Sequence, residues 1–359
     1  MKKLLTLLVV SLLSFAVSAQ QLPNANFEDW SGEEFYGHIQ PASWNACNVV
    51  QFGFKFNFAH QEEGHRGQYS LMVQDQEVGA AGIVEVSPGY FSLGHPWVFI
   101  KSLFKVGGAS AGTWGGVDWK YRPDTMSVWI KRTGDNTDKE DFYLLYYSWI
   151  GDSYGEHYKG KNEKCTECSF TNEESDIRQL MDGNECGTTT MVEQVAEGMW
   201  RERKTYGKWT NIRVPIFYNS DKVPTKMNVI FSASNYPNFR ANTGLYAGNS
   251  LYVDDVVLIY SDKIHKVMLD GKEWKGFNMN SKEEQVCVVE AMPKTIEFYR
   301  GEGDLTNARG TTAHFAGRKL GGSELSIVEG ELNGKPMEVK VKSGDGKTSR
   351  VYKIKFVTK

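Results

Sequence analysis

Short stretches in which apolar and polar residues alternate run along most of the chain, and long helical periodicities are scarce. Residues 49–58 place Phe52, Phe54, Phe56 and Phe58 at every second position, which predicts one strand with four rings on one face. Phe142–Ile150 is apolar throughout, which indicates a strand buried on both faces. Other strands are predicted at Tyr69–Val73, Trp97–Leu103, Thr125–Lys131, Trp209–Phe217, Met227–Ala233 and Leu251–Tyr260. These patterns predict an all-β protein.

Two segments place carboxylates inside otherwise apolar, aromatic patterns. They are Asn24–Trp30 and Leu251–Leu258, which lie near the two ends of residues 20–262. A half-buried strand carries carboxylates at core positions only where something holds their charge. We interpret the pair as the first and last strands of one β-sandwich, lying side by side.

A polar stretch at residues 152–205 interrupts the alternation and predicts a long insertion between strands. Glu173–Met181 has the composition of a short helix with Thr171 or Asn172 as its cap. Met191–Trp200 is interpreted as an amphipathic turn. Insertions of this length are uncommon unless they are functional or mobile.

A second part of the chain begins after residue 262. A hairpin is predicted at Val267–Trp274 around Asp270-Gly271-Lys272, because glycine accepts the positive φ of such a turn. Further short strands are predicted at Val286–Val289, Thr295–Tyr299, Glu324–Val328, Met337–Val341 and Arg350–Val357. This density of strands and turns predicts a small immunoglobulin-like sandwich. The expected organisation is a signal peptide at 1–19, one domain at 20–262 and a second at 263–359.

The N-terminus indicates export. Lys2 and Lys3 precede an apolar run from Leu4 to Val17, and Val17-Ser18-Ala19 is a small-residue cleavage site. Cleavage leaves a mildly acidic chain, because the formal charge falls from −3 when both lysines are lost. Such a chain has no broad electrostatic affinity for nucleic acid, and no membrane insertion is expected after cleavage. The expected location is the periplasm, the cell surface or the medium.

The five cysteines leave one unpaired if disulfides form. Cys165, Cys168 and Cys186 lie in the polar insertion and suggest either a loop disulfide with a free thiol or a small metal site with His157. Cys47 and Cys287 lie in apolar surroundings and are predicted core residues.

An ordered series of motifs carries a family resemblance. Trp114-Gly-Gly-Val, Tyr121-Arg-Pro-Asp-Thr-Met, Trp209–Tyr218, Ile230–Tyr236 and Gly248–Val256 resemble segments of the Bacteroidetes "putative carbohydrate metabolism domain" family over roughly residues 22–262. The resemblance implies an exported jelly-roll β-sandwich associated with glycan use. The insertion at 152–205 departs from the family, and so does the position of the immunoglobulin-like domain after the jelly roll.

The two acidic segments also resemble the calcium-binding ends of carbohydrate-binding jelly rolls. The resemblance implies a structural Ca²⁺ held by Glu28 and Asp254, with backbone carbonyls near Asn26 and Gln68. The alternative is that both carboxylates cap strand ends by accepting backbone N–H groups.

Aromatic and polar residues supply candidates for a sugar face, because the C–H face of a pyranose packs on a ring and side chains bind its hydroxyls. A core position is the alternative for any single tryptophan, and Trp129 and Trp149 are predicted core residues because they lie inside strand patterns. Trp114 and Trp119 rank highest because they lie in or beside a Gly-rich segment, 107–118, that we interpret as a loop. The candidates are Trp114, Trp119, Tyr121, Trp44, Trp97, Tyr236, Asn235, Arg240 and Asp118.

No pair of acids stands in a spacing that selects it for glycosidase chemistry. Tyr154-Gly-Glu156-His157-Tyr158 could mimic a lyase or hydrolase site, with a polar loop as the alternative. Together with the family resemblance, these observations predict a monomeric glycan-binding protein of a polysaccharide-utilisation system, with an oligo- or polysaccharide as partner. The alternatives are a glycoside hydrolase or polysaccharide lyase acting on the concave face, and an adhesin-like surface protein.

Overall fold

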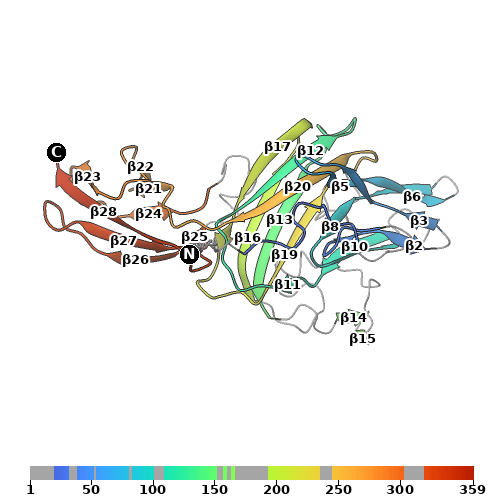
Figure 1. Ribbon diagram of the computed structural model, residues 1–359, viewed down its shortest axis with the longest axis horizontal. Coiled ribbons are helices and arrows are strands. Elements are labelled where there is room, and N and C mark those ends of the chain that lie inside the picture. The colour runs from blue at the N-terminus through green and yellow to red at the C-terminus, as the bar shows by residue number, and fades with distance from the viewer. Residues whose placement is uncertain are drawn as a thin grey trace, which may run out of the picture.

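The computed structural model describes residues 20–31, 39–51, 54–80, 83–100, 109–151, 157–159, 163–165, 193–234, 245–302 and 319–359. Within these ranges the protein is all-β and contains no helix, as the alternating pattern predicts. Its strands gather in two groups at opposite ends of an elongated molecule, with β25 (Lys319–Leu320) near the junction (Figure 1). No helix in the described part of the chain is long and apolar enough to cross a membrane.

The first group contains two large sheets. The five-stranded sheet has the order β17-β12-β20-β5-β4. Its strands are β17 (Tyr206–Pro215), β12 (Thr125–Thr133), β20 (Ser250–Ile259), β5 (Tyr69–Gln74) and β4 (Ala59–Glu63). The eight-stranded sheet has the order β1-β8-β19-β13-β16-β18-β25, with β11 also paired to β19. Its other strands are β1 (Asn45–Ala46), β8 (Tyr90–Ser92), β19 (Lys226–Ser232), β13 (Phe142–Ile150), β16 (Glu193–Glu202), β18 (Phe217–Tyr218) and β11 (Val117–Asp118).

The strand order is that of a jelly roll. The eight principal strands in chain order are β5, β8, β12, β13, β16, β17, β19 and β20. Numbered one to eight, they give the order 1-8-3-6 in one sheet and 2-7-4-5 in the other, which is two interlocked Greek keys. The predicted fold class is therefore confirmed, and the first and last of these strands, β5 and β20, are neighbours.

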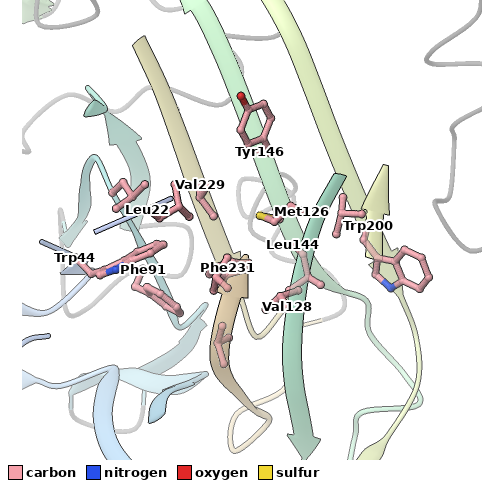
Figure 2. Packing of buried hydrophobic residues seen from close by; sticks show 14 of the residues in the cluster. Leu22, Trp44, Phe91, Met126, Val128, Leu144, Tyr146, Trp200, Val229 and Phe231 are labelled. Atoms are coloured by element: carbon pink, nitrogen blue, oxygen red, sulfur yellow. The ribbon is translucent and has the colours of Figure 1, made fainter. Parts of the chain in front are cut away.

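The main core lies between the two sheets. Figure 2 shows Met126 and Val128 of β12 beside Leu144 of β13, with Phe231 of β19 nearby. A second cluster lies on the opposite face of β13, where Tyr143, Leu145, Tyr147 and Trp149 are all buried. Strand β13 is thus covered on both faces, as its continuous apolar pattern predicts.

Several short hairpins decorate this sandwich. They pair β2 (Val49–Gln51) with β3 (Phe54–Phe56), β6 (Gln76–Ala80) with β7 (Ile83–Ser87), β9 (His95–Ile100) with β10 (Ala109–Trp114), and β14 (His157–Lys159) with β15 (Glu163–Cys165).

Two of these hairpins correct the sequence predictions. The single strand at 49–58 was wrong, because β2 and β3 pair antiparallel and the chain reverses between them. Phe54 is consequently 45% exposed whereas Phe58 is fully buried. The loop predicted at 107–118 was also wrong, because β10 occupies part of it.

The insertion was predicted too long. Residues 193–202 form β16, a central strand of the eight-stranded sheet, so the amphipathic turn at Met191–Trp200 was wrong. Six consecutive residues, Val195–Trp200, are buried, and a strand covered on both faces has no alternation to reveal it. The helix predicted at Glu173–Met181 lies outside the described residues.

The N-terminal acidic segment is a turn and not a strand. Asn24 and Phe27 have positive φ angles of 43° and 50°, which no regular strand accommodates. The segment nevertheless lies beside β20, as predicted, because Val256 N donates to Ala25 O (2.8 Å) and the Gln21 side chain bonds both backbone groups of Leu258.

The second group of strands forms two further sheets. One contains β22 (Lys272–Glu273), β21 (Lys266–Leu269) and β24 (Ile296–Tyr299); the other contains β23 (Glu284–Val289), β28 (Ser349–Thr358), β27 (Met337–Lys342) and β26 (Glu324–Val328). They enclose a separate core that includes Cys287, Val339, Ile354 and Phe356. The predicted burial of Cys47 and Cys287 is confirmed.

A buried polar junction joins the two groups of strands. The carboxylate of Asp124, at the start of β12, accepts the backbone N–H groups of Ser261 (2.6 Å) and Gly322 (2.9 Å). The Arg122 guanidinium donates to Gly322 O (3.2 Å), and Arg122 N donates to Gly344 O (3.1 Å). Next to them, β25 pairs with β18, so the C-terminal part extends the eight-stranded sheet.

Candidate functional site

The outer face of the five-stranded sheet is the most distinctive surface in the described part of the chain. Strand β12 alternates along its length: Met126, Val128 and Ile130 are fully buried, whereas Trp129 and Lys131 on the other face are only half-buried. A tryptophan on the outward face of a strand leaves part of its ring open to solvent. The outward residues of β12 therefore belong to the protein surface and not to the hydrophobic core.

Four rings gather on this outer face. The His65 ring stacks on Trp129 with centroids 3.8 Å apart and lies 5.8 Å from Trp209. Trp209 in turn lies 6.5 Å from Tyr252, edge to face. They come from β12, β17, β20 and the turn between β4 and β5. We call Trp129, Trp209, Tyr252 and His65 the ring face.

Two cations flank the ring face. The Lys131 ammonium lies 3.9 Å from the centroid of Tyr252 and 5.4 Å from that of Trp209. The Arg66 guanidinium lies 5.8 Å from Trp129 and 3.9 Å from the carboxylate of Asp255. Cation–π contacts of this kind contribute about 0.5–2 kcal/mol each, depending on exposure.

Polar side chains lie beside the rings on the same sheet. Asn211 of β17 is opposite Trp129 in the ladder, and its Nδ2 donates to Ser127 Oγ (2.9 Å). Arg213, two residues further along β17, pairs with Glu302. Rings flanked by amide, hydroxyl and charged groups make a surface that can stack on an apolar face and bond hydroxyls.

The two unusual carboxylates hold the turn that carries His65. Glu28 accepts the backbone N–H groups of Gln68 (3.0 Å) and Tyr69 (3.1 Å), and Asp254 accepts that of His65 (2.7 Å). A Cβ at Gly67 would lie 1.7 Å from a Glu28 oxygen, so a side chain there would displace the Glu28 carboxylate. The acids therefore position the His65 ring over Trp129.

A β-bulge explains why an apolar strand tolerates adjacent acids at 254 and 255. The register of β12 and β20 shifts between Ser127 and Trp129, and Asp255 has a φ of 47° at that point. The extra residue turns the Asp255 carboxylate towards His65 Nδ1, 3.2 Å away. Burial raises the pKa of Asp254 to about 6.

The calcium prediction stays untested, and the hydrogen bonds required by its alternative are present. Each of the four carboxylate oxygens of Glu28 and Asp254 accepts one backbone N–H. Asn26 is exposed. Among the described residues, no three His, Cys, Asp or Glu side chains are placed to hold a metal ion. The carboxylates as placed fit strand-end caps better than a calcium shell, which needs six to eight oxygens.

Two of the predicted sugar-face tryptophans lie in the core. Trp44 is 2% exposed, packs against Phe27 and Phe231, and donates its Nε1–H to Pro23 O (3.1 Å). Trp119 is 6% exposed. The core alternative thus holds for both, because neither ring has a face open to a ligand.

The other predicted site residues are scattered. Tyr121 is half-buried against Trp119 and Tyr260, and Asp118 is exposed with its carboxylate on Lys226 (2.7 Å). In the β9–β10 hairpin, Trp97 pairs with Gly112 and Trp114 pairs with His95. Asn235, Tyr236, Arg240, Cys168, Cys186 and the Tyr154–Glu156 segment lie outside the described residues. The described residues therefore do not bring the predicted set together.

A second group of acids is buried at one end of the sandwich. Asp75 is 1% exposed and Glu140 2% exposed. Burial and mutual repulsion raise the pKa of Asp75, and burial raises that of Glu140. Asn249 donates to Glu140, and Ser234 Oγ and Gly89 N each donate to Asp75 (2.8 Å). These contacts tie strand ends together, and neither carboxyl is open to a substrate.

Sequence reasoning missed the ring face, and the prediction that Trp129 is a core residue was wrong. The signal was present in Thr125–Thr133, where Ser127, Trp129, Lys131 and Thr133 share one parity and the purely apolar residues share the other. A tryptophan among polar residues of one face indicates a surface ring. Trp149, in the uniformly apolar β13, is fully buried as predicted.

The chain is similar to three solved structures of Bacteroides proteins. No model of a known protein family matches the chain, and no curated protein matches it. A "putative glycoside hydrolase" from Bacteroides thetaiotaomicron aligns with a TM-score of 0.39 at 14% identity, covering 68% of this chain and 72% of that one. Another from Bacteroides vulgatus has a TM-score of 0.36 at 12% identity, covering 65% and 96%. A "putative sugar binding protein" from Bacteroides thetaiotaomicron has a TM-score of 0.24 at 10% identity, covering 60% and 86%.

Proposed function

We propose that this is an exported glycan-binding protein of a polysaccharide-utilisation system, and that it binds sugar on the ring face. The observation that carries the proposal is the contiguous set of half-buried rings on the outer side of β12, β17 and β20. Rings on a rigid sheet offer apolar contact area with little conformational entropy to lose, because their backbone is already fixed by the ladder.

The surroundings of the rings support a carbohydrate over a purely apolar ligand. A pyranose has one face of C–H groups and a rim of hydroxyls, so it needs a ring beneath it and hydrogen-bonding groups beside it. Asn211, Ser127 and Lys131 supply such groups within the same three strands. The family resemblance of residues 22–262 points to the same class of ligand.

The test is a glycan array with the mature chain, followed by titration of any hit. We expect Trp209→Ala and Trp129→Ala to weaken binding at least tenfold, which is about 1.4 kcal/mol. Trp274→Ala is the matched control, because Trp274 is a half-buried tryptophan of the C-terminal part that packs on Phe277. An equal loss of affinity in all three variants, or no loss of affinity in Trp209→Ala and Trp129→Ala, would show that the ring face is not the binding site.

The same experiment addresses the alternatives. Product analysis on each bound glycan tests the glycoside hydrolase or lyase alternative, since cleavage changes the chain length. An intact, folded protein that binds no glycan on the array would favour the adhesin-like alternative.

A further inference from the structure

We infer that the ring face selects an anionic glycan, in which a carboxylate or sulfate group binds the Lys131 ammonium while a sugar ring packs on Trp209. This inference rests on the proposed function, since it assigns a ligand class to the same surface. Its starting point is the distribution of charge on the outer face of the five-stranded sheet.

Three carboxylates close to the rings already have partners. Asp254 accepts the N–H groups of His65 and Asp255, both at 2.7 Å. Asp255 contacts His65 (3.2 Å) and Arg66 (3.9 Å), and Glu302 is paired with Arg213. None of these acids is left as an unpaired negative charge that would repel an anion.

Lys131 differs from them. Among the described residues, no carboxylate lies within ion-pair distance of its ammonium, which rests between Tyr252 and Trp209. The residue is half-buried, and its ammonium has the rings of Tyr252 and Trp209 beside it in place of an opposite charge.

A bound anion would complete this arrangement. A carboxylate or sulfate oxygen on an ammonium is a charge-assisted hydrogen bond, which is stronger than a neutral one. The rings on both sides exclude water once a sugar covers them, and electrostatic attraction strengthens as the local dielectric falls. The cation also lies between two rings of the stacking surface, beside the position of a sugar ring packed on Trp209.

The experiment uses the mature full-length chain and two matched pairs of probes. One pair is an oligogalacturonate and its fully methyl-esterified form, in which a methyl ester replaces each charged carboxylate. The other is a sulfated galactan oligosaccharide and its desulfated form. Dissociation constants are measured by calorimetry for the wild type, for Lys131→Met, which keeps the apolar stem, and for Trp209→Ala. The control is Lys340→Met, which changes an exposed lysine of β27 in the C-terminal part.

We expect the charged member of at least one pair to bind at least tenfold more tightly, and Lys131→Met to abolish that preference. Preference within the first pair identifies a uronate and preference within the second a sulfate. Lys340→Met should behave as the wild type. Equal binding of charged and neutral members, with Trp209→Ala still weakening both, would overturn the anionic preference and leave the glycan-binding function standing. Binding only of uncharged array glycans would overturn it too, and binding of no glycan at all would overturn both proposals.

Discussion

The two sheets of the jelly roll use tryptophan in opposite ways. In β13 of the eight-stranded sheet, Trp149 lies among residues buried on both faces. In β12 of the five-stranded sheet, Trp129 lies on a face whose rings and polar groups remain partly exposed. In a sheet covered on both sides, the aromatic rings are buried in the core and contribute to folding. Only a sheet with one open face keeps rings that can serve a ligand.

The largest expected effect separates the two tryptophan classes by stability. Trp149→Ala should lower the free energy of unfolding by about 3–5 kcal/mol, because it opens a cavity in a closed core. Trp209→Ala should lower the free energy of unfolding by no more than about 1 kcal/mol and should instead weaken glycan binding at least tenfold. Urea denaturation measures the first effect and titration the second. Similar stability losses in both variants would contradict the assignment of Trp149 to the core and of Trp209 to the surface.

A second contrast lies within β12 itself, between neighbours on its two faces. Arg132 is fully buried and donates to the carbonyls of Thr137, Lys204, Glu140 and Ala233. Arg132→Met leaves these acceptors and the Asp75–Glu140 pair without a cation, so we expect a loss of about 3 kcal/mol.

Lys131→Met is the matched control, because the neighbouring side chain points to the outer face. We expect it to change unfolding free energy by no more than about 0.5 kcal/mol. A Lys131 variant as unstable as the Arg132 variant would contradict the assignment of faces.

The pH dependence of stability tests a buried acid at the start of β12. Burial raises the pKa of Asp124 from 3.8 to about 7. An acid with a raised pKa in the folded state contributes stability that is complete below the unfolded pKa and is lost as pH rises through the folded one. Unfolding free energy should therefore fall between about pH 4 and pH 7.

Asp124→Asn tests the origin of that slope, because an amide does not titrate. We expect its stability to vary less with pH than that of the wild type over the same interval, measured by urea denaturation at fixed ionic strength. Some slope will remain, since the pKa values of Asp75 and Glu140 are raised as well. Identical slopes in the two proteins would show that Asp124 keeps an ordinary pKa.

The smallest effect concerns the turn that supports His65. Glu28→Gln should cost about 1 kcal/mol, because an amide oxygen replaces only one of two charge-assisted acceptors. The calcium prediction is tested with the same variant: Ca²⁺ should raise the melting temperature of the wild type and not that of Glu28→Gln. An unchanged wild-type melting temperature in Ca²⁺ and in chelator would leave the carboxylates as caps alone.

Periodicity predicted the fold well where one face of a strand is buried. Met337–Lys342 lies where alternation places it, and so does β12. It missed β16 because a strand buried on both faces does not alternate. It merged β2 and β3 because their hairpin continues the same spacing of phenylalanines.

The site was harder to predict than the fold. Carboxylates at 28 and 254 were identified, but their role depends on a bulge at Asp255 and a turn at Gly67, which are three-dimensional features. The rings were misjudged because each tryptophan was weighed singly. Their proximity arises from the order β17-β12-β20, which joins residues distant in sequence.

The junction between the two strand groups has a mechanical consequence. Asp124 and Arg122 reach backbone groups of the C-terminal part, and β25 adds hydrogen bonds to the edge of β18. Bending there would separate Asp124 and Arg122 from their hydrogen-bond partners and break the β18–β25 pairing, so we expect these contacts to resist bending between the two groups of strands. A force applied at the ring face would then reach the C-terminal part through this junction.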